Sequence, residues 1–83
     1  MAHAPRRPRH PMPDYVEDAL VNGGLMALYR ARPPYQQNDY VGWISRAKRP
    51  ETRSKRLNQM LDELRTGDVY MKMAWRPAKT PPT

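Results

Sequence analysis

The sequence lacks several residue types and patterns, and each absence excludes a class of site or fold. None of its 83 residues is a cysteine, which excludes a disulfide framework and a thiolate metal site. No apolar run is long enough to predict a membrane-spanning helix. The stretch 1–13 carries positive charge but no apolar segment, so we expect no secretory signal and a cytoplasmic location.

Arrangements of residues typical of catalysis are also missing. The two histidines, His3 and His10, lie in a proline-rich stretch without a third ligand nearby, so we expect solvated side chains and no metal site. Helix capping or surface exposure explains four acidic residues, namely Asp39, Glu51, Asp62 and Glu63. The sequence therefore predicts a protein that is not an enzyme and that needs no cofactor.

Positive charge is abundant. Lysine and arginine number 15 against 8 acidic residues, giving a net charge of +7, which favours acidic partners. The charge is densest over residues 46–56, with six bases and one acid. The candidate residues for binding an anion or a partner are Arg46, Lys48, Arg49, Arg53 and Arg56. An alternative interpretation is structural, with some of these arginines pairing with nearby acids and capping the last carbonyls of the preceding helix.

The spacing of apolar residues predicts an all-α fold, a small bundle of about four helices near 14–22, 24–32, 34–48 and 50–66, with no sheet. Pro34 and Pro50 suit the first turn of a helix, where a missing N–H has no intrahelical partner. Arg49 precedes Pro50 and is disfavoured in α geometry, so the third helix is expected to end near Lys48. Gly67 ends the fourth helix.

Seven residues are predicted to form a common core, with Trp43 largely buried beside them: Leu20, Leu28, Tyr40, Ile44, Leu57, Leu61 and Leu64. Gly42 is unusual inside a helix and either permits close approach of another helix or is incidental. A core in roughly sixty residues stabilises a fold by only about 3–5 kcal/mol. A monomer or a weak homo-oligomer is expected.

The predicted domain organisation has three parts: a disordered Pro/Arg-rich head (1–13), a helical domain (14–67) and an extended or disordered tail (68–83). Apolar and other residues alternate over 69–75, which is typical of an extended segment. No second strand is predicted to pair with it. The segment either lies across the bundle or is available to a partner.

Two strings of residues and a later pair resemble a known family: Tyr40-Val41-Gly42-Trp43-Ile44, then Ala47-Lys48-Arg49-Pro50-Glu51-Thr52-Arg53, then Arg56-Leu57. With these strings, residues 13–73 resemble the bacterial YdeI-like, OmpD-associated family of bacteriocin-protection proteins. The resemblance implies a small all-helical domain. It also implies an association with tolerance to bacteriocins or cationic peptides, and in some members with an outer-membrane porin.

Two functions remain open. The first is a protein-interaction or stress-tolerance module with an unidentified protein partner, as the resemblance implies. The alternative is a nucleic-acid-binding protein that uses the basic turn within 46–56 and the basic ends of the chain, since such charge favours nucleic acid or another polyanion. Charge alone predicts only binding without sequence preference.

Overall fold

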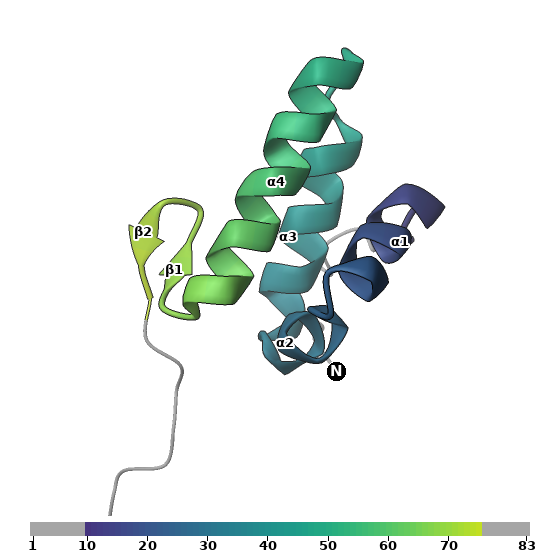
Figure 1. The fold of residues 1–83 in the computed structure, drawn as a ribbon. Coiled ribbons are helices and arrows are strands. Elements are labelled where there is room, and N and C mark those ends of the chain that lie inside the picture. The colour runs from purple at the N-terminus through teal and green to yellow at the C-terminus, as the bar shows by residue number, and fades with distance from the viewer. Residues whose placement is uncertain (1–9, 76–83) are drawn as a thin grey trace, which may run out of the picture.

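The computed structural model describes residues 10–75, which form four helices and a short β-hairpin (Figure 1). The elements in chain order are α1 (Asp14–Asn22), α2 (Met26–Ala31), α3 (Pro34–Ser45), α4 (Pro50–Thr66), β1 (Val69–Tyr70) and β2 (Met73–Ala74). The predicted all-α class is confirmed, since helices dominate and the sheet has only two short strands. The predicted bounds of α1 and α4 agree with the structure, whereas α2 and α3 are shorter than predicted.

Prolines and a glycine set the ends of the longer helices. Pro34 and Pro50 are the first residues of α3 and α4, each preceded by a residue with extended ψ. Gly67 follows α4 with a φ of 85°, a left-handed conformation that glycine adopts without a steric penalty. The end of α3 was predicted three residues too late. After Ser45, the N–H of Ala47 bonds to the Ile44 carbonyl in a tighter turn, and the chain then extends toward Pro50.

Helices α3 and α4 lie side by side and run in opposite directions, joined by the short connection 46–49 (Figure 1). Helix α2 contacts both of them, and α1 packs on α2. The hairpin lies beside the C-terminal end of α4, at the opposite end of this helix from the 46–49 connection (Figure 1). The two ends of α4 therefore meet different parts of the chain.

The core is a single apolar cluster shared by all four helices, made of Val16, Leu20, Leu25, Tyr29, Tyr40, Val41, Ile44, Met60, Leu61 and Leu64. Five predicted core residues belong to it, and Leu57 and Trp43 pack against it half-buried. The prediction for Leu28 is wrong, because this side chain is 46% exposed. Leu25 and Tyr29 are four residues apart and share the buried face of the short segment around α2, while Leu28 lies outside that face.

The prediction that no sheet forms is also wrong. Strands β1 and β2 pair antiparallel, with Val69 opposite Ala74 and Tyr70 opposite Met73. The two residues between the strands, Met71 and Lys72, have φ values of 50° and 64°. Such values at both central residues characterise the type I′ turn of tight hairpins, but residues other than glycine, asparagine or aspartate seldom adopt them.

The chain before α1 lies on α3. The backbone N–H of His10 donates to the Asn38 side-chain oxygen at 2.8 Å. A Cβ atom on Gly42 would lie 2.7 Å from atoms of the His10 ring, so a larger residue at this position would force the ring to move. Gly42 therefore permits a close approach, but by the segment before α1 rather than by another helix. His3 and the rest of the predicted head before residue 10 lie outside the described residues.

Candidate functional site

The five predicted binding residues fall into two groups at the start of α4. Arg46, Lys48 and Arg49 belong to the 46–49 connection, here called the basic turn, and their side chains are exposed. Within residues 10–75, none of these three forms an ion pair with a carboxylate. Arg53 and Arg56 lie within the first two turns of α4 and are partly buried.

Arg56 is bonded to the last turn of α3, and Arg53 is bonded to the connection that follows it. Arg53 Nη2 donates to the Ala47 carbonyl at 3.3 Å, and Arg56 Nη1 donates to the Trp43 carbonyl at 2.6 Å. Each guanidinium also lies over an aromatic ring, Arg53 at 5.7 Å from Tyr15 and Arg56 at 5.3 Å from Trp43. Arg56 thus satisfies a carbonyl that the end of α3 leaves unpaired, as the structural interpretation expects, while Arg53 bonds to a carbonyl of the connection. Within residues 10–75, neither arginine forms the ion pair with an acid that this interpretation also expects.

The basic turn surrounds the positive end of a 17-residue helix. The N-cap residue of α4, Arg49, makes no side-chain bond to the first turn, and Pro50 has no N–H to offer. Lys48 and Arg49 precede this helix end directly. Arg46 instead lines a shallow depression of about 280 Å³ that faces the hairpin, together with residues such as His10, Asp39 and Tyr70. The positive potential at the start of α4, which favours binding of an anion, is therefore strongest beside Lys48 and Arg49.

The opposite end of α4 holds a polar centre that sequence reasoning missed. Glu63 is only 5% exposed, and its carboxylate accepts four hydrogen bonds. Oε1 accepts from the Tyr40 hydroxyl at 2.5 Å and from the Met71 N–H at 2.8 Å. Oε2 accepts from the Lys72 N–H at 2.9 Å and from the Gln59 amide at 3.0 Å. The carboxylate therefore binds both N–H groups of the strained hairpin turn.

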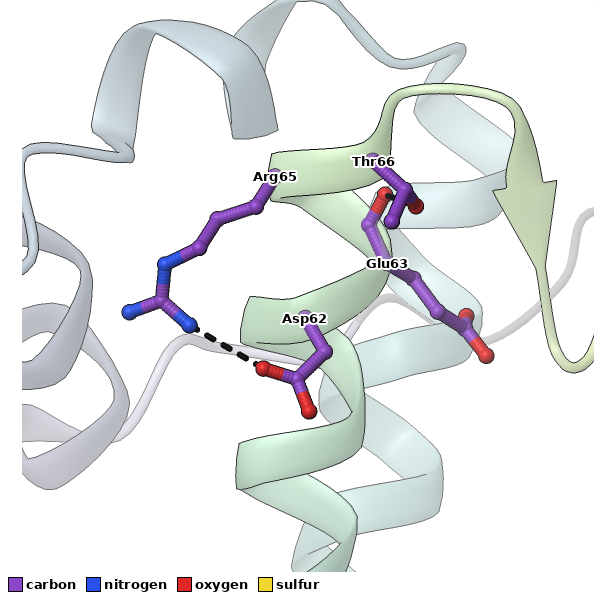
Figure 2. A network of polar contacts seen from close by, with 4 residues as sticks. All are labelled: Asp62, Glu63, Arg65 and Thr66. Atoms are coloured by element: carbon purple, nitrogen blue, oxygen red, sulfur yellow. Dashed lines mark hydrogen bonds and ion pairs between the residues drawn. The ribbon is translucent and has the colours of Figure 1, made fainter.

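Figure 2 shows that the buried Glu63 and the exposed Asp62 lie on different sides of α4. Glu63 points toward the hairpin, whereas Asp62 and Arg65 point to another side of the helix and pair at 3.1 Å. The backbone carbonyl of Glu63 also accepts hydrogen bonds, from the Thr66 hydroxyl at 3.0 Å and from Arg32 Nη2 at 2.8 Å. Both the side chain and the backbone of Glu63 thus tie α4 to its surroundings.

The hydroxyl of Tyr40, which donates to Glu63, stays protonated because it is buried. Burial raises the pKa of Tyr40, and the hydrogen bond to Glu63 and the charge of that carboxylate raise it further. Tyr40 therefore remains a neutral donor over the ordinary pH range. Arg32 is buried nearby, where it donates to Gln36 at 3.0 Å and lies 4.4 Å from the ring of Trp75. With four donors bonded to its two oxygens, the Glu63 carboxylate positions the hairpin.

Among residues 10–75, no helix combines the length and the apolar character needed to cross a membrane. The same part of the chain contains no group of three or more metal-ligating side chains that could hold an ion. A family model described as "Bacteriocin-protection, YdeI or OmpD-Associated" matches residues 10–67. No curated protein gives a significant match to the chain. No solved structure gives one either.

Proposed function

The chain belongs to the bacteriocin-protection, YdeI or OmpD-associated family, and we propose that it is a non-enzymatic module that binds an acidic protein partner through the basic turn. The observation that carries this proposal is the exposure of Lys48 and Arg49, without a carboxylate partner among residues 10–75, at the positive end of α4. Binding of a partner is also the way in which such a module would contribute to the protection that the family description names.

The two bonded arginines support this function indirectly. Because Arg53 and Arg56 donate to carbonyls near the end of α3, they fix the angle at which α4 leaves the basic turn. Lys48 and Arg49 are therefore presented from a connection that is anchored on both sides. A preorganised cation loses less entropy on binding a carboxylate than one on a loose segment, and arginine can bind a carboxylate with two parallel hydrogen bonds.

An acidic protein is favoured over nucleic acid by the same contacts. A helix that enters a DNA groove needs its basic side chains to reach phosphates and base edges. On α4, Arg53 and Arg56 are already bonded to the backbone carbonyls of Ala47 and Trp43. In the first two turns of the helix, residues 50–56, Lys55 is the one exposed cation, and the exposed cations of the basic turn lie before the helix begins. The remaining positive charge suits a few carboxylates on a partner surface.

The test compares three single charge reversals: Lys48→Glu and Arg49→Glu in the basic turn, and Arg30→Glu on α2 as the control with the same charge change. Arg30 is exposed and lies on another helix. The proteins are applied to immobilised poly-glutamate and to immobilised duplex DNA, and eluted with increasing salt. We expect the two turn variants to elute from poly-glutamate at clearly lower salt than the control.

Two results would overturn the proposal. Equal elution of all three variants from poly-glutamate would mean that net charge, and not the basic turn, decides retention. Retention on DNA that depends on Lys48 and Arg49, with no such dependence on poly-glutamate, would establish the nucleic-acid alternative. Thermal unfolding of each variant shows whether a change in elution reflects binding or loss of the fold.

A further inference from the structure

A second surface lies along α4, where the hairpin stands off from the helix and leaves an open groove of about 480 Å³. Its lining residues are Lys55, Asn58, Gln59, Asp62, Glu63, Thr66, Val69 and Lys72. We propose that this groove binds an extended, acidic peptide segment of a partner protein. The proposal goes beyond the basic turn and does not depend on it, so either surface can fail without the other.

The groove has two walls of different origin. Residues spaced three or four apart on α4, including Lys55, Gln59 and Asp62, lie on one side of the helix and form the first wall. Val69 and Lys72 of the hairpin form the second wall. The hydrogen bond from the Lys72 N–H to Glu63 fixes the turn that carries this second wall. The groove therefore exists in the folded protein without help from a ligand.

The charged side chains that line the groove differ in whether they are already paired within the protein. Asp62 is paired with Arg65, and the Glu63 carboxylate is bonded to four donors (Figure 2). Lys55 and Lys72 are exposed, and in the part of the chain that the structure describes neither joins a carboxylate in an ion pair. A ligand thus meets two available ammonium groups and two carboxylates that are already engaged, which favours a ligand that carries negative charge.

The dimensions suit a short peptide. From Lys55 to Thr66 the helix axis rises by about 16 Å, which corresponds to roughly five residues of extended chain. The volume also falls within the range of about 300–1,000 Å³ that is common for ligand sites. Val69 and the aliphatic stems of the two lysines offer apolar surface between the charges. Acidic side chains that alternate with small apolar ones would match this pattern.

Other occupants fit less well. A nucleic-acid strand gains most of its affinity from a continuous row of phosphates, whereas the described residues that line the groove offer only two ammonium groups, those of Lys55 and Lys72. A second copy of this chain carries a net charge of +7, so its surface is poorly matched to a groove that offers ammonium groups. An acidic segment of a different protein is the occupant that the charges favour.

The test uses a fluorescein-labelled synthetic peptide of alternating glutamate and valine, titrated by fluorescence anisotropy. Lys55→Gln and Lys72→Gly each remove one ammonium group from the groove. Lys72→Gly should keep the hairpin, because glycine accepts the φ of 64° more easily than lysine does. Arg30→Gln on α2 is the matched control for the loss of one charge.

We expect each groove variant to weaken peptide binding roughly fivefold, the effect of losing one partly exposed charge pair, while Arg30→Gln changes it less than about twofold. No binding by the wild-type chain, or equal weakening in all three variants, would overturn the groove proposal. Weakening by Lys48→Glu with unchanged binding by Lys55→Gln and Lys72→Gly would also overturn it, and would leave the basic turn as the binding surface.

Discussion

The charged residues at the two ends of α4 differ in their exposure to solvent. At the first turn, Lys48 and Arg49 extend into solvent just before Pro50, and they form no ion pair within residues 10–75. At the last turn, Glu63 is buried and its carboxylate is surrounded by four hydrogen-bond donors. The solvated charges cost the fold almost nothing, whereas a buried carboxylate is tolerated only when donors replace the water that it has lost.

This difference separates the parts of the molecule that bind from the part that holds it together. Solvated charges near the helix start can meet a partner without disturbing the core. The buried charge organises three segments that are distant in sequence, since Tyr40 comes from α3, Gln59 from α4 and the Met71 and Lys72 amides from the hairpin. The hairpin contributes Tyr70 and Met71 to the edge of the core, while β2 is exposed, so these polar contacts add to a limited apolar contact in holding the hairpin.

The largest effect is expected for Glu63→Gln, with Asp62→Asn as the matched control on the neighbouring residue. An amide at position 63 cannot accept all four hydrogen bonds, and a loss of about 2–3 kcal/mol in the free energy of unfolding should follow. Asp62 is exposed and paired only with Arg65, so its amide should cost less than about 1 kcal/mol. Urea unfolding measures both changes.

Hydrogen exchange sharpens this prediction. The amides of Met71 and Lys72 donate to Glu63, so they should exchange markedly faster in Glu63→Gln than in the wild-type chain. If the two variants unfold at the same urea concentration and exchange these amides at the same rate, Glu63 does not hold the hairpin.

A smaller effect is expected for Tyr40→Phe, which removes one donor to Glu63 and should cost about 1–2 kcal/mol. The pKa of Tyr40 is raised in the folded state by burial and by Glu63. The stability gained from its protonated form is therefore complete below the unfolded pKa of about 10, and is lost as the pH rises from there toward the folded value.

Urea unfolding from neutral pH to about pH 11 measures this dependence. The wild-type chain should lose stability steeply above about pH 10, and Tyr40→Phe should lose it less steeply. Some slope should remain in the variant, because burial also raises the pKa of Tyr29. Parallel profiles for the two proteins would show that Tyr40 does not couple the fold to alkaline pH.

The smallest effect is expected in the basic turn. Lys48→Glu should change the free energy of unfolding by no more than about 0.5 kcal/mol, because its side chain is solvated, and the change should be a gain, because a carboxylate suits the positive end of α4. Arg56→Gln should cost about 1 kcal/mol, since it removes the bond to the Trp43 carbonyl. Thermal or urea unfolding of the two variants checks this order, and a larger loss for Lys48→Glu than for Arg56→Gln would reverse our division of the cationic residues.

Local sequence signals were sufficient for much of the helical fold. Proline at the first position of α3 and α4 and glycine after α4 act on the backbone within one or two residues, so these ends could be read from the sequence. The apolar stripe of α4 likewise identified Leu61 and Leu64 as core residues. These features need no knowledge of the tertiary structure.

The hairpin could not be predicted in this way. Its turn contains Met71 and Lys72, without the glycine or asparagine that usually marks a type I′ turn. The acceptor for both turn amides is Glu63, eight and nine residues earlier on a helix. A turn stabilised by a distant carboxylate leaves no local signal in the sequence.

The candidate site was predicted in part. Sequence reasoning placed the five cationic residues near one connection. Only the structure separates the two arginines that donate to backbone carbonyls from the three exposed side chains. Glu63 was interpreted as a capping or surface residue. Its spacing of three from Met60 places it next to the apolar face of α4, and an acid at such a position was the available signal for burial.

The fit between His10 and Gly42 makes the effect of one substitution conditional on a distant part of the chain. Alanine at position 42 would favour α3 by about 1 kcal/mol if the helix stood alone. In the folded protein its methyl group would collide with the imidazole of His10. The same change therefore keeps its full benefit in a chain that begins after residue 10, whereas in a chain that includes it the imidazole must first move aside. Comparing the effect of the substitution in the two chains measures how firmly the preceding segment is held on α3.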